Sequence, residues 1–111
     1  MVQEPGGVER VLDVAKIRNY LLSHGHPVGG MKAAFFREMG YEPGDWRMLE
    51  ADLLALASQA SLEVGRFDEY GCRYQQRGVL IGPNGHSARV VTVWIRRTGE
   101  SALRFVTAYP E

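Results

Sequence analysis

The spacing of hydrophobic residues changes near Ser61 and divides the chain into two halves. In residues 8–58 apolar side chains recur every three or four positions, which is typical of helices that bury one face. In residues 61–109 apolar and polar side chains alternate, which is typical of strands in a half-buried sheet. Residues 1–7 follow neither period and are predicted to form a loose arm. We therefore predict one domain over residues 1–111, with a helical half followed by a sheet half.

Three helices are expected in the first half. The first spans about residues 14–23, and Asp13 is its predicted N-cap because an aspartate there accepts a hydrogen bond from an amide of the first turn. The second spans about residues 30–39 and ends at Gly40, a residue type that readily adopts the left-handed conformation found after helices.

The third helix begins at Trp46, with Asp45 as its predicted cap. Its apolar side chains recur at the positions that share one helical face, namely Trp46, Leu49, Leu53, Leu56 and Ala57. With Phe35 and Phe36 of the second helix, this stripe is predicted to form the core.

Four strands are predicted in the second half, with bounds at residues 62–67, 72–81, 87–97 and 103–109. The turns between them are short, and such links join antiparallel neighbours. Residues 8–13 form either an edge strand or an extended lead-in to the first helix. The predicted fold class is α+β, with three N-terminal helices packed on one face of a four-stranded antiparallel sheet.

Alternation along strand 87–97 predicts which side chains face the helices. The face rich in β-branched residues is expected under the helices, and it carries Arg89, Val91, Val93 and Ile95. Thr92 and Trp94 are then expected on the opposite, open face.

The same reasoning applies to strand 103–109. Phe105 is predicted to be buried, which places Arg104 on the open face. Thr107 is then expected on the core side, unless twist or a bulge near the end of the strand redirects it.

Composition limits the function classes. Lys plus Arg and Asp plus Glu both number 13, and this balance argues against a strong nonspecific nucleic-acid binder. Cys72 is the single cysteine, so an internal disulfide is excluded, and no metal-ligand spacing is present. We predict neither a metal nor a cofactor. The lack of a bilayer-spanning apolar run or a signal-peptide pattern predicts no membrane association and a cytoplasmic protein.

The stretch 24–36, HGHPVGGMKAAFF, is the strongest candidate for chemistry. Its Pro-Gly-Gly turn carries His26 and leads into a helix whose first turn contains Lys32. Free amide groups and the positive end of the helix dipole lie at the same place. Histidine, lysine and a helix N-terminus together suit an anion such as a phosphodiester.

The chain resembles a small uncharacterised bacterial domain family, from about Val11 to Pro110. The resemblance rests on YLLSHGHPVGGMKAAFF, MGY followed by W..L..DL, YG.RY, GPNG..ARVVTVW and the closing RFVTAYP. Domains of this family occur alone and as tails of phage-head-like and polymorphic toxin proteins. The resemblance implies no settled function.

A more distant likeness in layout is to the barnase–EndoU–colicin–RelE-like toxin ribonucleases, which place helices before a four-stranded antiparallel sheet. That group often combines a His and a Lys from the helical half with Arg, Thr, Ser or Tyr from the sheet. Here His26 and Lys32 match the first pair. The candidates for the second set are Arg104, Thr92, Thr107 and Tyr109. The chain contains no motif specific to a characterised member of that group.

The first functional hypothesis is a toxin-like, metal-independent ribonuclease. His26 would act as general base or acid because its ordinary pKa lies near neutrality. Lys32 and Arg104 would stabilise the phosphate, and Thr92 or Thr107 would hydrogen-bond a phosphate oxygen. The remaining residues predicted to bind RNA are Trp94 and Tyr109, either of which would stack a base, with Arg73 and Arg89.

The second hypothesis is an interaction domain without catalysis, such as an immunity or antitoxin-like partner or an oligomerising module. The balanced charge and regular core favour it. An RNA substrate and a cognate immunity or antitoxin protein are therefore the two partners considered. The sequence leaves the oligomeric state open.

Overall fold

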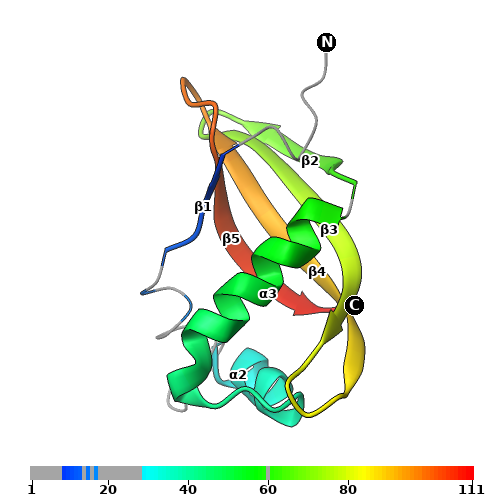
Figure 1. The fold of residues 1–111 in the computed structure, drawn as a ribbon. Helices are drawn as coiled ribbons and strands as arrows, with labels where there is room; N and C mark the ends of the chain where they lie inside the picture. The colour runs from blue at the N-terminus through cyan, green and yellow to red at the C-terminus, as the bar shows by residue number, and fades with distance from the viewer. Residues whose placement is uncertain (1–8, 14, 16, 18–28, 60) are drawn as a thin grey trace.

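The computed structural model describes residues 9–13, 15, 17, 29–59 and 61–111, and for residues 29–33 and 59 it describes the backbone path alone. Within these ranges the chain forms one five-stranded sheet in the order β1-β5-β4-β3-β2 (Figure 1). The strands are β1 (Arg10–Val11), β2 (Glu63–Asp68), β3 (Gly71–Ile81), β4 (Ser87–Arg97) and β5 (Leu103–Pro110). The four predicted strands are therefore present, with ends that differ from the prediction by at most one residue.

The predicted fold class is nevertheless wrong, because the sheet has a fifth strand and is mixed. β1 pairs in parallel with β5, with Arg10 opposite Leu103, whereas the other neighbouring strands are antiparallel. The edge-strand reading of residues 8–13 was thus the correct alternative. A strand of two residues is too short to show a period of two, so the sequence pattern could not count it.

Two α-helices are described rather than three: α2 (Gly29–Glu38) and α3 (Trp46–Gln59). The predicted first helix, over 14–23, lies largely outside the described residues. At its start the Asp13 carboxylate accepts a hydrogen bond from the Ala15 amide at 2.9 Å, and the Asp13 carbonyl accepts one from Ile17 at 3.2 Å. This is the bonding expected of an N-cap.

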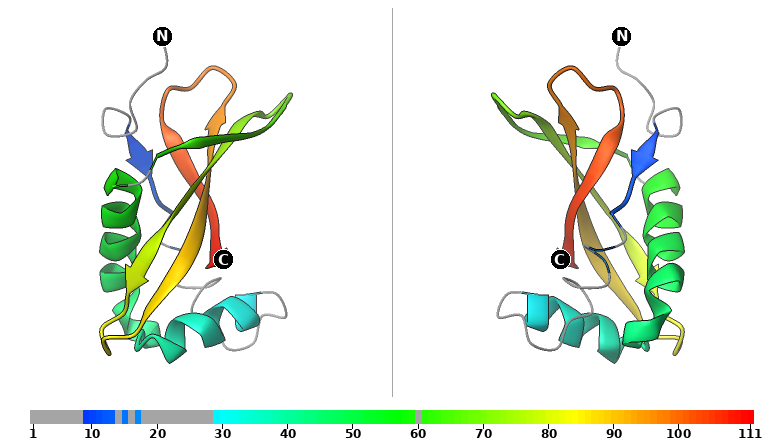
Figure 2. Two further views of the ribbon diagram at one scale, coloured as in Figure 1. Left: turned by 90° about the vertical axis from the view of Figure 1, so that its right-hand side faces the viewer. Right: turned by 90° about the vertical axis from the view of Figure 1, so that its left-hand side faces the viewer.

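The helices also do not share one face of the sheet. α3 runs along one face, whereas α2 crosses below one end of the sheet and begins on the side away from α3 (Figure 2). A 3₁₀ turn over Pro43–Asp45 leads into α3. Glu42 is the N-cap of this turn, and the Asp45 carboxylate accepts a hydrogen bond from the Glu42 amide at 2.9 Å, as in a capping box. Asp45 was predicted to cap α3 itself, and it is instead part of the turn that precedes α3.

The C-terminal end of α2 is fixed by the turn between β3 and β4. Gly40 has a φ of +100°, and the Tyr41 amide donates to the Phe36 carbonyl at 3.1 Å, which is the ending predicted for this helix. The Asn84 side chain donates to the Glu38 carbonyl at 2.8 Å. Gly82 approaches so closely that a Cβ on it would lie 2.0 Å from the Met39 carbonyl oxygen.

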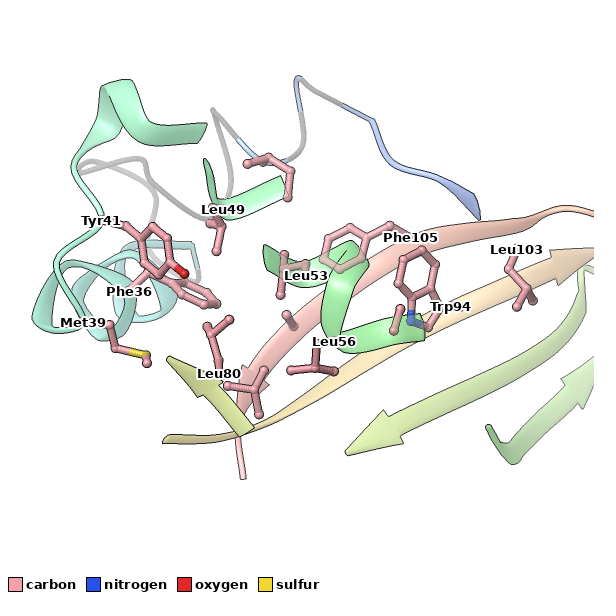
Figure 3. Close-up of a cluster of buried hydrophobic side chains, with 14 residues drawn as sticks. Phe36, Met39, Tyr41, Leu49, Leu53, Leu56, Leu80, Trp94, Leu103 and Phe105 are labelled. Atoms are coloured by element: carbon pink, nitrogen blue, oxygen red, sulfur yellow. The ribbon is translucent and has the colours of Figure 1, made fainter. Parts of the chain in front are cut away.

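The core lies between α3, the end of α2 and the face of the sheet that α3 covers (Figure 3). Leu49, Leu53 and Phe36 are fully buried as predicted, whereas Trp46 and Phe35 are half-buried. The buried hydrophobic residues of this cluster are Ile17, Phe36, Met39, Tyr41, Leu49, Leu53, Leu56, Ala57, Leu80, Val90, Trp94, Leu103, Phe105 and Ala108.

The predicted faces of β4 are reversed in the structure. Trp94 pairs with Phe105, and Thr92 pairs with Ala108, so both lie on the face covered by α3. Thr92 and Trp94 are fully buried. Val93 and Ile95 lie on the open face instead. The prediction failed because β-branched residues occupy both faces of this strand, and a hydrogen bond to Trp94 satisfies the Thr92 hydroxyl.

A bulge in β5 changes the face of its second half. Val93 pairs with Thr107 and Trp94 pairs with Phe105, so Val106 is an extra residue between two registers. Arg104 lies opposite Ile95 on the open face, as predicted. Thr107 joins it there, which is the outcome that a bulge was expected to produce.

Substitution of Gly82 by alanine tests how closely α2 packs against the β3–β4 turn. The added Cβ has no room beside the Met39 carbonyl, so we expect Gly82→Ala to lower the free energy of unfolding by about 1–3 kcal/mol. Gly44→Ala is the matched control, because a Cβ there has no neighbour within 4 Å. Urea denaturation of both variants measures the difference, and equal stabilities would contradict the close contact.

Leu53→Ala tests the core under α3. Leu53 is fully buried, so truncation should cost about 2–5 kcal/mol through lost burial and the cavity left behind. Met48→Ala on the same helix is the control, because Met48 is 44% exposed. A loss below about 0.5 kcal/mol for Leu53→Ala in chemical denaturation would mean that this face of α3 is not the packed one.

Candidate functional site

The open face of the sheet, on the side away from α3, gathers polar side chains from three strands. Cross-strand pairing places Arg77 beside Val91, and Val91 beside Tyr109, across the middle of the sheet. The polar residues of this face that are candidates for the functional site are Arg73, Arg77, Arg89, Arg104, Thr107 and Tyr109. This face therefore carries guanidinium groups on β3, β4 and β5, and two hydroxyl groups on β5.

Four charged residues on this face form a connected group, here named the Arg–Glu cluster: Glu63, Arg77, Arg89 and Glu111. The Arg77 guanidinium donates to Glu63 at 2.9 Å and to Glu111 at 2.8 Å. The Arg89 guanidinium donates to the other oxygen of Glu111 at 3.0 Å. One carboxylate therefore lies between two guanidinium groups.

The arginines alter the acidity of the central carboxylate. Hydrogen bonds from Arg89 and then from Arg77 hold the pKa of Glu111 below its usual value. The two guanidinium groups therefore stabilise the ionised form of Glu111, and they make its carboxylate a weaker base while both bonds are in place. The cluster offers a proton acceptor and two cations within one group of side chains.

Arg73 and Arg104, which also lie on the open face, are paired with carboxylates as well. Arg73 donates to Asp68 at 2.9 Å, and Arg104 donates to both oxygens of Glu100 at 2.9 and 3.2 Å. The Arg104 bond lowers the pKa of Glu100. These four arginines thus carry carboxylate partners, so an anion that binds to them must share or displace the carboxylates.

The remaining site candidates on the sheet divide between the two faces. Thr107 and Tyr109 are half-buried on the open face. Thr92 and Trp94 lie under α3, where the Trp94 indole donates to the Thr92 hydroxyl at 3.0 Å and the Arg10 guanidinium lies 4.7 Å from the Trp94 ring centroid. The three sheet residues predicted to act in catalysis therefore do not share one face: Arg104 and Thr107 lie on the open face and Thr92 lies under α3.

The helical candidates lie partly outside the described residues. His26 lies outside them entirely, so its predicted role stays a prediction. Lys32 lies in the first turn of α2, which contacts β5 and begins on the open-face side of the sheet (Figure 2). The strand end that carries Tyr109 is the end that α2 crosses.

The sequence analysis did not identify Arg77 and Glu111 as site residues. Arg77 lies four positions after Arg73 on β3, so a period of two places both on one face, and this was the signal that could have found it. Glu111 follows the last strand, where alternation no longer applies. Its contacts with Arg77 and Arg89 depend on the sheet register.

Across the described ranges no three His, Cys, Asp or Glu side chains gather in a way that could hold a metal ion. A helix long and apolar enough to cross a bilayer is likewise missing from the part of the chain that the structure describes.

Comparison with solved structures finds the same fold in a chain of a contact-dependent growth inhibition toxin–immunity protein complex from Klebsiella pneumoniae 342. The TM-score is 0.70 at 17% sequence identity, and the match covers 91% of this chain and 99% of that one. At this identity the likeness is one of fold. No curated protein matches the chain.

A family model matches almost the whole sequence, over residues 5–111. The family is described as a domain of unknown function, which agrees with the resemblance to an uncharacterised domain family drawn from the sequence motifs. The chain belongs to this family, Domain of unknown function (DUF6883).

Proposed function

We propose that this protein is a toxin-like, metal-independent ribonuclease whose active site lies on the open face of the sheet, beside the start of α2. The observation that carries the proposal is the Arg–Glu cluster, which holds an ionised carboxylate between two guanidinium groups. The fold that the chain shares with part of a toxin–immunity complex supports a toxin-related role.

Cleavage of RNA without a metal needs three kinds of group. A base removes the proton of the 2′-hydroxyl, an acid protonates the departing 5′-oxygen, and cations stabilise the charge on the phosphorus centre. The products are a 2′,3′-cyclic phosphate and a 5′-hydroxyl. DNA lacks the 2′-hydroxyl and is not a substrate for this reaction.

In the proposed mechanism these groups come from the open face of the sheet, from Lys32 in the first turn of α2 and from His26. Glu111 accepts the 2′-hydroxyl proton, and His26 in its protonated form acts as the acid. Arg89 exchanges part of its bond to Glu111 for a phosphate oxygen, and Lys32 adds a second cation. The Thr107 hydroxyl hydrogen-bonds another phosphate oxygen.

The flanking residues would bind the rest of the RNA strand. Tyr109 presents a ring on which a base can stack. Arg73 and Arg104 lie farther along the sheet and would contact neighbouring phosphates. Thr92 and Trp94 have no part in this proposal because both are buried under α3.

A second candidate function is an immunity or antitoxin-like interaction domain. Two observations favour it: four arginines of the open face are already paired with carboxylates, and large apolar side chains are exposed on and beside β2. These side chains are Val64, Phe67 and Tyr70. Under either proposed function the partner is a cognate toxin or immunity protein. For the ribonuclease, an RNA substrate implies action in the cytoplasm.

Incubation of the purified protein with a labelled RNA oligonucleotide in EDTA tests the ribonuclease proposal. We expect cleavage that leaves 2′,3′-cyclic phosphate ends and spares DNA of the same sequence. His26→Ala should reduce turnover by about 10²-fold or more, as for loss of a general acid. Arg89→Ala and Thr107→Val should reduce cleavage by smaller factors, because each loses one contact to the phosphate.

Arg47→Ala is the matched control, since Arg47 is an exposed arginine on α3, on the other side of the sheet, and its removal should leave cleavage unchanged. Circular dichroism of each variant establishes that it is folded. A folded wild-type protein that leaves a panel of structured and single-stranded RNAs intact would exclude the enzyme and favour the interaction domain. Full cleavage by the His26→Ala protein would remove His26 from the mechanism.

A further inference from the structure

A pocket on the α3 side of the sheet is separate from the open face. Its lining residues include Gly71 at the β2–β3 turn and Thr98, Gly99 and Glu100 in the β4–β5 turn. These two turns lie at the end of the sheet beyond the end of α3 (Figure 1). Its volume is about 360 Å³, within the range of pockets that hold small ligands. The pocket is lined by Phe67, Gly71, Cys72, Tyr74, Arg96, Arg97, Thr98, Gly99 and Glu100.

Arg96 is a cation in this pocket without a carboxylate partner among the described residues. Its Nη2 donates to the Tyr74 hydroxyl at 3.0 Å, and its Nε is buried without a hydrogen-bond partner. Glu100 also lines the pocket, but both of its oxygens are bound by Arg104. A half-buried guanidinium with a neutral partner favours an anion in the adjoining space.

The groups beside Arg96 make the pocket suitable for an aromatic ring. Burial, followed by the Cys72 thiol, raises the pKa of Tyr74, so its hydroxyl stays neutral beside Arg96 at neutral pH. The Arg96 guanidinium lies 5.4 Å from the Tyr74 ring centroid. Phe67 pairs with Cys72 across β2 and β3, so its ring lies on the pocket side, where it is 77% exposed. Exposure of this extent leaves an apolar surface that a ligand can cover.

We propose that this pocket binds a small aromatic anion, a carboxylate or sulfonate on one or two rings, whose charge pairs with Arg96 and whose rings pack on Phe67 and Tyr74. The volume suits a molecule of this size. The proposal does not rest on the ribonuclease activity, because Arg96, Phe67 and Tyr74 have no part in that reaction.

Cys72 makes the proposal directly measurable. It is the single cysteine of the chain and lines the pocket, so alkylation by iodoacetamide reports on this place alone. Naphthalene-2-sulfonate, at concentrations that saturate binding in calorimetry, should slow alkylation. The neutral 2-naphthol has the same rings and should bind about tenfold or more weakly, because it cannot form the charge-assisted bond with Arg96.

Three variants separate the pocket from nonspecific binding. Arg96→Gln should weaken naphthalene-2-sulfonate binding by about tenfold, and Phe67→Ser should weaken both probes because it removes ring contact. Phe67 is largely exposed, so this variant is expected to fold even if Arg96→Gln does not. Arg66→Gln is the matched control, since Arg66 also lies on β2 but does not line the pocket.

The proposal is supported when the sulfonate slows alkylation of Cys72 in the wild-type protein and in Arg66→Gln but not in Arg96→Gln. Equal binding of the sulfonate and 2-naphthol would overturn it, as would tight sulfonate binding by Phe67→Ser. Absence of any calorimetric signal with the folded wild-type protein would overturn it as well.

Discussion

The position of α3 on the sheet depends on a fully buried glutamine. The Gln76 side chain donates to the Ala57 carbonyl, in the last turn of α3, at 2.8 Å, and accepts from Arg10 of β1 at 2.8 Å. A carbonyl near a helix end has no partner within the helix, so this bond satisfies a group that burial would otherwise leave unpaired. One side chain thereby connects α3, β3 and the short edge strand β1, and an apolar residue of similar volume would leave two polar groups without this partner.

The alternation that places Gln76 under α3 places Arg77 on the open face. β3, β4 and β5 each therefore supply both the core and the candidate site, so a shift of one of these strands changes both. Moving a strand by one residue would bury the arginines and expose the residues that contact α3. The bulge at Val106 is the one change of phase on β5, and it brings Thr107 to the same face as Arg104. The catalytic proposal thus relies on a local irregularity as much as on the regular sheet.

The sequence predicted strand positions well and faces poorly, for a physical reason. Turns rich in glycine and asparagine mark strand ends through local backbone preferences, and these appear in the sequence itself. Faces depend on which side chains find partners across strands. Thr92 seemed suited to solvent, but the Trp94 indole satisfies it inside the core. The Arg–Glu cluster joins residues up to 48 positions apart, from Glu63 to Glu111, and only the register reveals it.

The carboxylates on the open face have a consequence for how the protein responds to ionic strength. A surface of unpaired lysines and arginines binds nucleic acid much more weakly as the salt concentration rises, because each of these side chains that contacts a phosphate releases a counterion condensed on the nucleic acid. Arg77, Arg89 and Arg104 are already paired with carboxylates, so a phosphate that binds them exchanges one anion for another. The affinity of this face for a polyanion would then fall less with rising salt than the number of its arginines suggests. It would depend strongly on whether the incoming phosphate fits the positions that the carboxylates occupy. Such a surface discriminates between shapes of polyanion more than between amounts of charge.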